Sequence, residues 1–478
     1  MHNIKLTNFI IGLLYLGVVL WFSSILLGYN SIYVKLLVIG LAIIPFVFTN
    51  IIKSREYWLI IGLGSTIFVS KIPLPLLDAI SIGYTINAII LGLIFAELAM
   101  KKLTLPKVFE SFPNRCMALF MFIVTARCLY DRPGAGSMGG TGGLSAALPT
   151  LLAGWCFFST YILAKQFEVN KKQLKILKII VIIGFTDVIY KNITIFLPHG
   201  FVNIFPYPAA WFLSFLGLTR IIDKLSDEKD FKLDVKLICA TTFIMVISFL
   251  SLNRAPVIYA PLSLLVIYWC YKFLNKYFIL FLIGMIIIIT TVALYPSIIP
   301  KPAMRTMSLF TGKVDKSATQ ELGETGWMSN WRATLARIAW EDIKRHPIAG
   351  KGFAFAFEDL FFNAILAKSG DDARFGGLLL SGGYHNSFLF SAVKIGLPAT
   401  IAYILAMINI YYRFLKFSRR LTHSEFKQFC VTLAGIFVCV YGKMLTNGGP
   451  LDLFSMSITM ATMQGIMINN KKTSNTIE

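Results

Sequence analysis

The sequence predicts an all-α polytopic membrane protein, with about 12–14 transmembrane helices and one large, partly helical loop outside the bilayer. Three observations indicate this fold class. The 478 residues are 56% hydrophobic and only 14% charged, whereas charged residues make up about a quarter of a soluble domain. Apolar runs of about 18–20 residues, the length that crosses a bilayer, recur along the chain. Clusters of lysine and arginine separate these runs at regular intervals.

The basic clusters predict the orientation of the chain. Cytoplasmic loops are rich in lysine and arginine, which accounts for the net charge of +21 without nucleic acid as a partner. Each interval between clusters has room for two apolar helices, so we expect about fourteen spans and both termini in the cytoplasm. The expected spans are roughly 8–27, 33–50, 57–70, 81–100, 116–130, 145–164, 177–196, 203–219, 235–252, 255–271, 277–297, 385–412, 428–445 and 449–468.

The spacing of the cysteines and carboxylates indicates neither a metal site nor a redox site. The seven cysteines include no CxxC pair, so we expect neither a disulfide framework nor a zinc site. Asp371 and Asp372 are a lone pair of carboxylates, and metal binding there is the lesser interpretation. We therefore expect no cofactor. The first run, 8–27, lacks a small-residue cleavage site and is expected to be a retained helix.

Residues 298–384 contain no apolar run of membrane length. They divide the chain into an N-terminal transmembrane bundle (1–297, about eleven spans), this loop, and about three C-terminal spans (385–478). By alternation the loop lies on the outer side, the periplasm in a bacterium, and long loops of this kind usually carry function. Within it, 329–347 spaces its apolar residues as a helix does. We expect an amphipathic helix that rests on the membrane or on the bundle.

Several polar residues converge on the outer face in this topology. Charged groups in or near a bilayer are costly, so each is a candidate for function. Two flank the glycine-rich stretch 132–143, one lies in the tight turn SLNRAPV, one begins the amphipathic helix, and two open the twelfth span. They are Arg127, Arg132, Arg254, Arg332, His385 and Asn386.

Each candidate also has a purely structural interpretation. Arg254 could lie at the interface with its charge in water, and Arg332 could be an exposed helix residue. His385 and Asn386 could cap the helix that follows them. For Arg127 and Arg132 the structural interpretation is the stronger one. The glycine-rich stretch fits a hairpin turn better than a phosphate cradle.

Arginines that gather on one face suit a phosphate-bearing substrate. A guanidinium group remains charged and binds phosphate oxygens with two parallel hydrogen bonds. A histidine titrates near neutral pH and can take the proton of a sugar hydroxyl. Together they fit a glycosyl-transfer site with a diphosphate leaving group.

Three motifs resemble the O-antigen ligase and O-antigen polymerase superfamily of bacterial envelope enzymes. The first is the tight turn NRAP at 253–256. The second is a helix that begins at Arg332 and ends in a Pro-x-x-Gly-x-Gly pattern over 347–352. The third is the pair His-Asn at 385–386, followed after nine residues by Gly-x-x-small over 396–399. The large loop before the last three spans is also similar.

The resemblance implies a metal-independent, inverting glycosyltransferase of the inner membrane with its active site on the periplasmic face. The donor would be a glycan on undecaprenyl diphosphate. Arg254 and Arg332 would hold the diphosphate, and His385 would activate the acceptor hydroxyl. Asn386, Arg132 and Arg127 are further candidates for substrate contacts. A chain-length regulator is a possible protein partner.

Three functions remain open. A polymerase of O-antigen or exopolysaccharide repeat units is favoured, because about fourteen spans suit the polymerases better than the ligases. A ligase would transfer the polymer to lipid A–core or to a protein. A lipid-linked oligosaccharide flippase is the more distant alternative, because its charges should be spread through the bilayer centre rather than gathered on one face.

Overall fold

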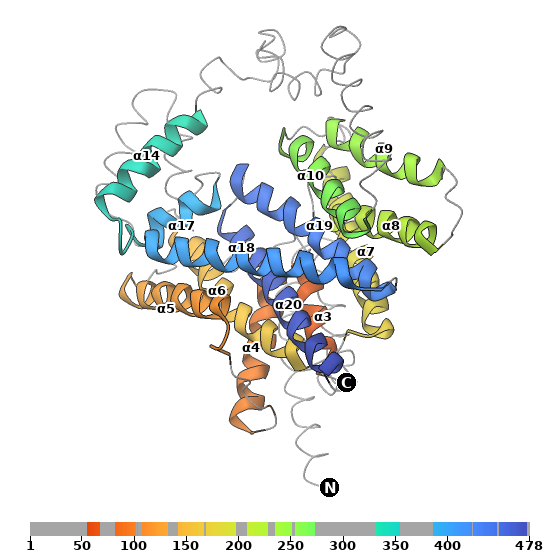
Figure 1. Ribbon diagram of the computed structural model, residues 1–478. Coiled ribbons are helices and arrows are strands. Elements are labelled where there is room, and N and C mark those ends of the chain that lie inside the picture. Colours follow the sequence, from red (N-terminus) through yellow and green to blue (C-terminus); the bar gives the residue numbers. More distant parts are fainter. Residues whose placement is uncertain are drawn as a thin grey trace, which may run out of the picture. The chain divides into compact units, whose positions relative to one another are not determined.

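The computed structural model shows an α-helical protein (Figure 1). The chain divides into two compact units, Met1–Trp58 and Leu59–Glu478, and every element below except the start of α3 belongs to the second. The structure describes residues 55–66, 82–101, 103, 108–131, 142–166, 169–196, 208–227, 235–250, 254–272, 331–353, 386–422, 424–446 and 449–475.

Thirteen helices make up the described part of the chain, and it contains no strand. Ten of them coincide with expected spans, and α14 coincides with the expected amphipathic helix. The helices are α3 (Glu56–Ser65), α4 (Ile82–Ala99), α5 (Phe112–Asp131), α6 (Gly142–Gln166), α7 (Lys171–Phe196), α8 (Pro208–Asp227), α9 (Val235–Leu250), α10 (Arg254–Cys270), α14 (Trp331–Arg345), α17 (Ser387–Ile395), α18 (Leu397–Arg420), α19 (Glu425–Thr446) and α20 (Pro450–Asn475).

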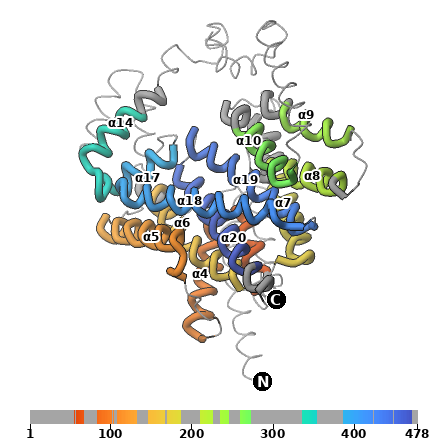
Figure 2. The backbone as a smooth tube through the Cα atoms, in the orientation of Figure 1, coloured from red at the N-terminus to blue at the C-terminus, as the bar shows by residue number. Residues whose placement is uncertain are grey.

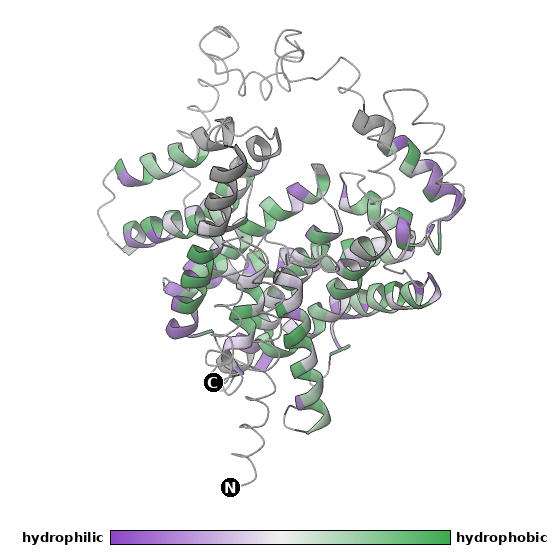
Figure 3. Ribbon diagram, turned by 180° about the vertical axis from the view of Figure 1, so that it is seen from behind, coloured by the Kyte–Doolittle hydropathy of each residue, from purple (hydrophilic) through white to green (hydrophobic). Residues whose placement is uncertain are grey.

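The helices have the composition of membrane spans. Among the described residues, four are long and apolar enough to cross a bilayer: Phe112–Asp131, Ala146–Gln166, Glu425–Thr446 and Pro450–Asn470. Figure 3 shows that the bundle helices are predominantly hydrophobic, whereas α14 is largely hydrophilic. On α5, large apolar side chains such as Phe122 and Leu129 are exposed, as expected for a surface that faces lipid. The predicted all-α polytopic membrane fold is confirmed.

Glycines let the helices approach one another closely. Gly465 in α20 lies against Ala164 in α6, and Gly442 in α19 lies against the ring of Tyr259 in α10. Membrane helices pack through small residues in this way, because close contact between backbones replaces the hydrophobic driving force that lipid does not provide. The helix α18 packs against both α5 and α20 (Figure 2).

Contacts between helix ends follow the alternation that the basic clusters predict. Gln428 near the start of α19 donates a hydrogen bond to Asp223 near the end of α8, at 2.9 Å. Gln464 in α20 donates to Ser111, just before α5, at 3.2 Å. Asp223 and Ser111 lie in loops that the sequence assigns to the cytoplasmic side, and Gln428 and Gln464 lie near the cytoplasmic ends of expected spans. The side of the membrane itself stays a prediction.

The prediction of one continuous span over 385–412 is wrong. The structure has two helices here, because α17 ends at Ile395 and α18 begins at Leu397. Gly396 between them has φ 87° and ψ 167°, a conformation that is essentially restricted to glycine. A proline follows at the start of α18, where its missing N–H has no helical partner to lose. With 9 residues, α17 is too short to cross a bilayer.

Candidate functional site

The predicted site residues are described to different extents. His385 and Arg132 lie outside the described residues, as does most of the glycine-rich stretch. Arg254 is the first residue of α10 and Arg332 the second of α14, but the side chains of both are outside the described part. Asn386 and Arg127 are described in full. The structure therefore places the backbone elements that carry the proposed chemistry and brings two of the six side chains into defined contacts.

Asn386 is the N-cap of α17 and fixes its direction. Its side-chain oxygen accepts hydrogen bonds from the backbone N–H groups of Phe388 and Leu389, at 2.9 and 3.0 Å. This is the expected N-cap, because the first amides of a helix have no partner inside the helix. The amide nitrogen of the same side chain donates to the carbonyl of Leu445 at the end of α19, at 3.1 Å. Asn386 therefore links two helices immediately after His385.

The turn between α19 and α20 is the second support of this end of α17. The hydroxyl of Ser387 donates to the carbonyl of Gly449 at 2.9 Å. Asp452 accepts from the N–H of Gly449 at 3.0 Å and pairs with Lys443 at 2.8 Å. An acidic residue at the third helical position that bonds back to the cap residue is one half of a capping box. The Asp452 side chain is 9% exposed.

Residues 347–353 close the other end of α17, and we call this segment, which contains the Pro-x-x-Gly-x-Gly pattern, the glycine turn. The N–H groups of Lys351 and Gly352 donate to the carbonyls of Val393 and Lys394, at 2.6 and 3.0 Å. Carbonyls in the last turn of a helix have no partner within it, so the turn supplies the missing donors. The N–H of Leu397 in turn donates to the carbonyl of Pro347 at 2.8 Å. Two motifs that the sequence separates by more than thirty residues form one junction.

Three glycines make this junction possible. Gly350, Gly352 and Gly396 have φ of 69°, 91° and 87°, values that side chains disfavour. A Cβ on Gly350 would meet the backbone of residues 394–396, and one on Gly396 would meet the carbonyl of Ile348. Close backbone approach and positive φ therefore require glycine at the positions that the family pattern marks.

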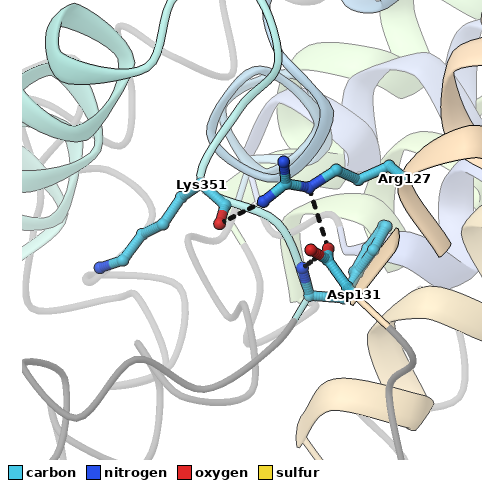
Figure 4. A network of polar contacts seen from close by, with 4 residues as sticks. Arg127, Asp131 and Lys351 are labelled. Carbon is cyan, nitrogen blue, oxygen red and sulfur yellow. Dashed lines mark hydrogen bonds and ion pairs between the residues drawn. The ribbon is translucent and has the colours of Figure 1, made fainter. Parts of the chain in front are cut away.

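Arg127 holds this junction to α5. Its Nε donates to Asp131 at 2.9 Å, and its Nη2 donates to the carbonyl of Lys351 at 2.8 Å (Figure 4). The same oxygen of Asp131 accepts from the N–H of Phe353 at 2.7 Å. The Arg127 and Asp131 side chains are 18% and 3% exposed. These contacts agree with the structural interpretation of Arg127, and its role in substrate binding stays a prediction.

The helix α14 rests on the bundle rather than on lipid alone. It packs against α17, and its apolar side chains Ala339 and Ile343 are buried. Asp342 of α14 pairs with Lys351 at 3.6 Å. The helix α14, which carries Arg332, is thus joined to the glycine turn, and the glycine turn is joined to α17, which follows His385.

Sequence reasoning missed Lys443, Asp452 and Asp131. The signal for Asp452 was the pattern Gly-Pro-x-Asp, in which proline starts a helix and an acidic residue occupies its first turn. Asp131 lies four residues after Arg127, the spacing of a helical ion pair. Lys394, a charged residue within the expected span 385–412, is buried in α17. In the described part of the chain, no three His, Cys, Asp or Glu side chains gather as metal ligands.

Comparison with known proteins supports the resemblance. Residues 238–404 match the model of a family described as O-antigen ligase. The match spans α9 and α10, the loop with α14, and the α17–α18 junction, and it contains all three motifs. Among curated proteins, none is similar enough to this chain to count as a match. The resemblance to the O-antigen ligase and polymerase superfamily is confirmed, and it indicates an enzyme of the glycosyltransferase type.

Proposed function

We propose, from the O-antigen ligase match at 238–404, that this chain transfers a glycan from undecaprenyl diphosphate to a sugar hydroxyl on the periplasmic face of the bacterial inner membrane. The observation that carries the proposal is the set of backbone hydrogen bonds between the glycine turn and the α17–α18 junction. These hydrogen bonds join the segment that follows α14, the helix with Arg332, to α17, the helix that follows His385. This connection supports a joint role for Arg332 and His385, and Arg254 is carried by α10.

The proposed reaction is a single displacement. The acceptor hydroxyl oxygen attacks the anomeric carbon, and its proton passes to His385. The bond from that carbon to the phosphate oxygen breaks, the configuration inverts, and undecaprenyl diphosphate leaves with the electron pair. Arg254 and Arg332 stabilise the charge on the leaving diphosphate. Because guanidinium groups supply this charge, the proposal requires no metal ion.

Polymerisation of O-antigen or exopolysaccharide repeat units is the leading form of the reaction. The acceptor is then a second lipid-linked repeat unit, and a chain-length regulator is a candidate partner. The expectation of about fourteen spans favours it. Ligation to lipid A–core is the second candidate, favoured by the description of the matched family as O-antigen ligase.

Reconstitution tests the proposal and separates the two forms. The purified protein in lipid vesicles receives a lipid-linked repeat unit, with or without lipid A–core, and product length is measured on a gel. A polymerase extends the repeat unit without core, whereas a ligase yields product only with core. If neither mixture yields product under conditions in which a known transferase of this type is active, the proposed function is wrong.

A further inference from the structure

Hydrogen bonds from neighbouring segments hold both ends of the helix α17. It has 9 residues, and isolated helices of this length are unstable. Its first turn bonds to the α19–α20 turn through Asn386 and Ser387. Its last turn bonds to the glycine turn through Lys351 and Gly352. The position of α17 therefore depends on what fixes these two loops.

A buried carboxylate fixes each loop in the same way. Asp131 accepts one backbone N–H from the glycine turn, that of Phe353, and pairs with Arg127 on its own helix. We name these three residues the Asp131 clamp (Figure 4). The Asp131 side chain is 3% exposed, so water screens the pair weakly.

The α19–α20 turn has the equivalent arrangement. Asp452 accepts the N–H of Gly449 and pairs with Lys443 one helix earlier, and these residues are the Asp452 clamp. Its carboxylate is 9% exposed, while Lys443 is 43% exposed. Charge-assisted hydrogen bonds are stronger than neutral ones, so each carboxylate holds a backbone segment that contacts α17 directly.

We infer that Asp131 and Asp452 are positioning residues that set the place of His385 relative to the arginine-bearing helix α14. The inference rests on the proposed function, since it assumes that His385 and Arg332 act on one substrate. His385 directly precedes Asn386, which bonds to the end of α19. The next residue, Ser387, bonds to the carbonyl of Gly449, whose N–H Asp452 accepts. Arg332 lies on the helix that leads into the turn held by Asp131. A displacement of about 1 Å between reacting groups costs about 10²-fold in rate.

The opposing interpretation is that Arg127 and Lys443 bind substrate phosphates directly. The two interpretations predict different changes of kcat and donor KM when the aspartate is replaced. If the cations bind substrate, loss of the neighbouring carboxylate alters the KM for the lipid-linked donor. If the carboxylates position α17, their loss lowers kcat and leaves donor binding nearly unchanged, because the reacting geometry and not the affinity is affected.

The test compares Asp131→Asn and Asp452→Asn with the control Glu341→Gln. Glu341 pairs with Lys344 on the surface of α14, with both side chains more than half exposed, so loss of this pair has little effect. A further variant, Arg127→Gln/Asp131→Asn, removes both charges and avoids an unpaired buried cation. For each protein, kcat and donor KM are measured in vesicles, and backbone hydrogen–deuterium exchange is measured by peptide.

We expect about a 10- to 100-fold loss of kcat in both aspartate variants, with donor KM within about threefold of the parent protein. Exchange should rise in the peptide over 347–353 for Asp131→Asn and over 442–452 for Asp452→Asn. Exchange over 442–452 should stay unchanged in Asp131→Asn, and exchange over 347–353 should stay unchanged in Asp452→Asn, so each variant is a control for the other. The Arg127→Gln/Asp131→Asn variant should show the exchange pattern and the kcat loss of Asp131→Asn.

Three results would overturn the inference. Unchanged exchange in both peptides would show that the carboxylates do not hold the loops. Faster exchange with unchanged kcat would show that the loops do not position the reacting groups. A rise in donor KM with kcat unchanged would assign the neighbouring cations to substrate binding. An inactive parent protein would instead contradict the proposed function, and the exchange measurement would still test whether the clamps hold the loops.

Discussion

Asn386 shows how one polar side chain serves two helices. Its oxygen caps α17 and its nitrogen bonds to the carbonyl that ends α19. The sequence offered two interpretations of this residue, a cap or a substrate contact, and the cap geometry is now defined. Because both functional groups of the amide are engaged with the protein, Asn386 contributes to the proposed site mainly by fixing the start of α17.

Replacement of His385 by alanine tests the proposed base. Without a group that accepts the hydroxyl proton, transfer should fall by about 10²–10⁴-fold. In cells, a polymerase variant should leave single repeat units attached to core, whereas a ligase variant should leave polymer on the lipid carrier. The first outcome is measured on a gel of surface glycan, and the second on a gel of glycan extracted with the lipid carrier. Glycan of normal amount and length in His385→Ala cells would contradict a catalytic role.

Lysine replacements test the proposed diphosphate contacts. Arg254→Lys and Arg332→Lys keep the charge but lose the forked geometry that binds two phosphate oxygens. We expect a large loss of transfer activity with normal amounts of protein in the membrane, measured by gel and by immunoblot. The matched control is Arg337→Lys on α14, a residue with no proposed role. Near-full activity in both lysine variants would exclude bidentate binding at these positions.

At the level of elements, the glycine turn supplies the hydrogen-bond partners that the backbone lacks at the break between α17 and α18. The family pattern of the two segments is visible in the sequence, but nothing in it shows that one segment supplies the amides that the other lacks. Hydrophobicity predicts one continuous span over 385–412, because Lys394, Gly396 and Pro398 interrupt the apolar run only locally. The backbone conformation of that glycine, and not hydrophobicity, divides the run into two helices.

Gly396→Ala tests the junction. An alanine there must adopt a conformation that costs about 1–3 kcal/mol, and its Cβ would overlap the carbonyl of Ile348. We therefore expect a lower thermal midpoint in detergent and reduced transfer activity. The control is Gly217→Ala in α8, where an added Cβ meets no atom within 4 Å and helix propensity improves by up to about 1 kcal/mol. Equal midpoints for the two variants would contradict the strain assigned to Gly396.

At the level of the whole chain, the predicted division is an N-terminal bundle (1–297), a periplasmic loop (298–384) and a C-terminal helical part (385–478). Ten of the described helices each correspond to one expected span, whereas the expected spans 8–27, 33–50 and 277–297 lie outside the described residues. The contacts of Gln428 with Asp223 and of Gln464 with Ser111 join helix ends that the sequence places near the same side. The orientation follows from charge alone and rests on the positive-inside rule.

Reporter fusions test this orientation. Alkaline phosphatase is active only in the periplasm, so a fusion after Gln320 should be active, and fusions after Lys172 and Arg420 should be inactive. Green fluorescent protein at the same positions should give the opposite pattern. Phosphatase activity at Lys172 or Arg420, or fluorescence at Gln320, would reverse the assignment of the loop and of the proposed active site to the periplasmic face.

The sequence by itself determined the membrane class, the approximate positions of most described helices, α14 among them, and the three family motifs. It could do so because hydrophobic length, basic clusters and helical spacing are local properties of the chain. The tertiary structure alone decided the break at Gly396, the partners of the glycine turn, and the burial of Asp131 and Asp452. Those features depend on which distant backbone groups meet, and unsatisfied amides and carbonyls at helix ends find their partners only when the helices pack.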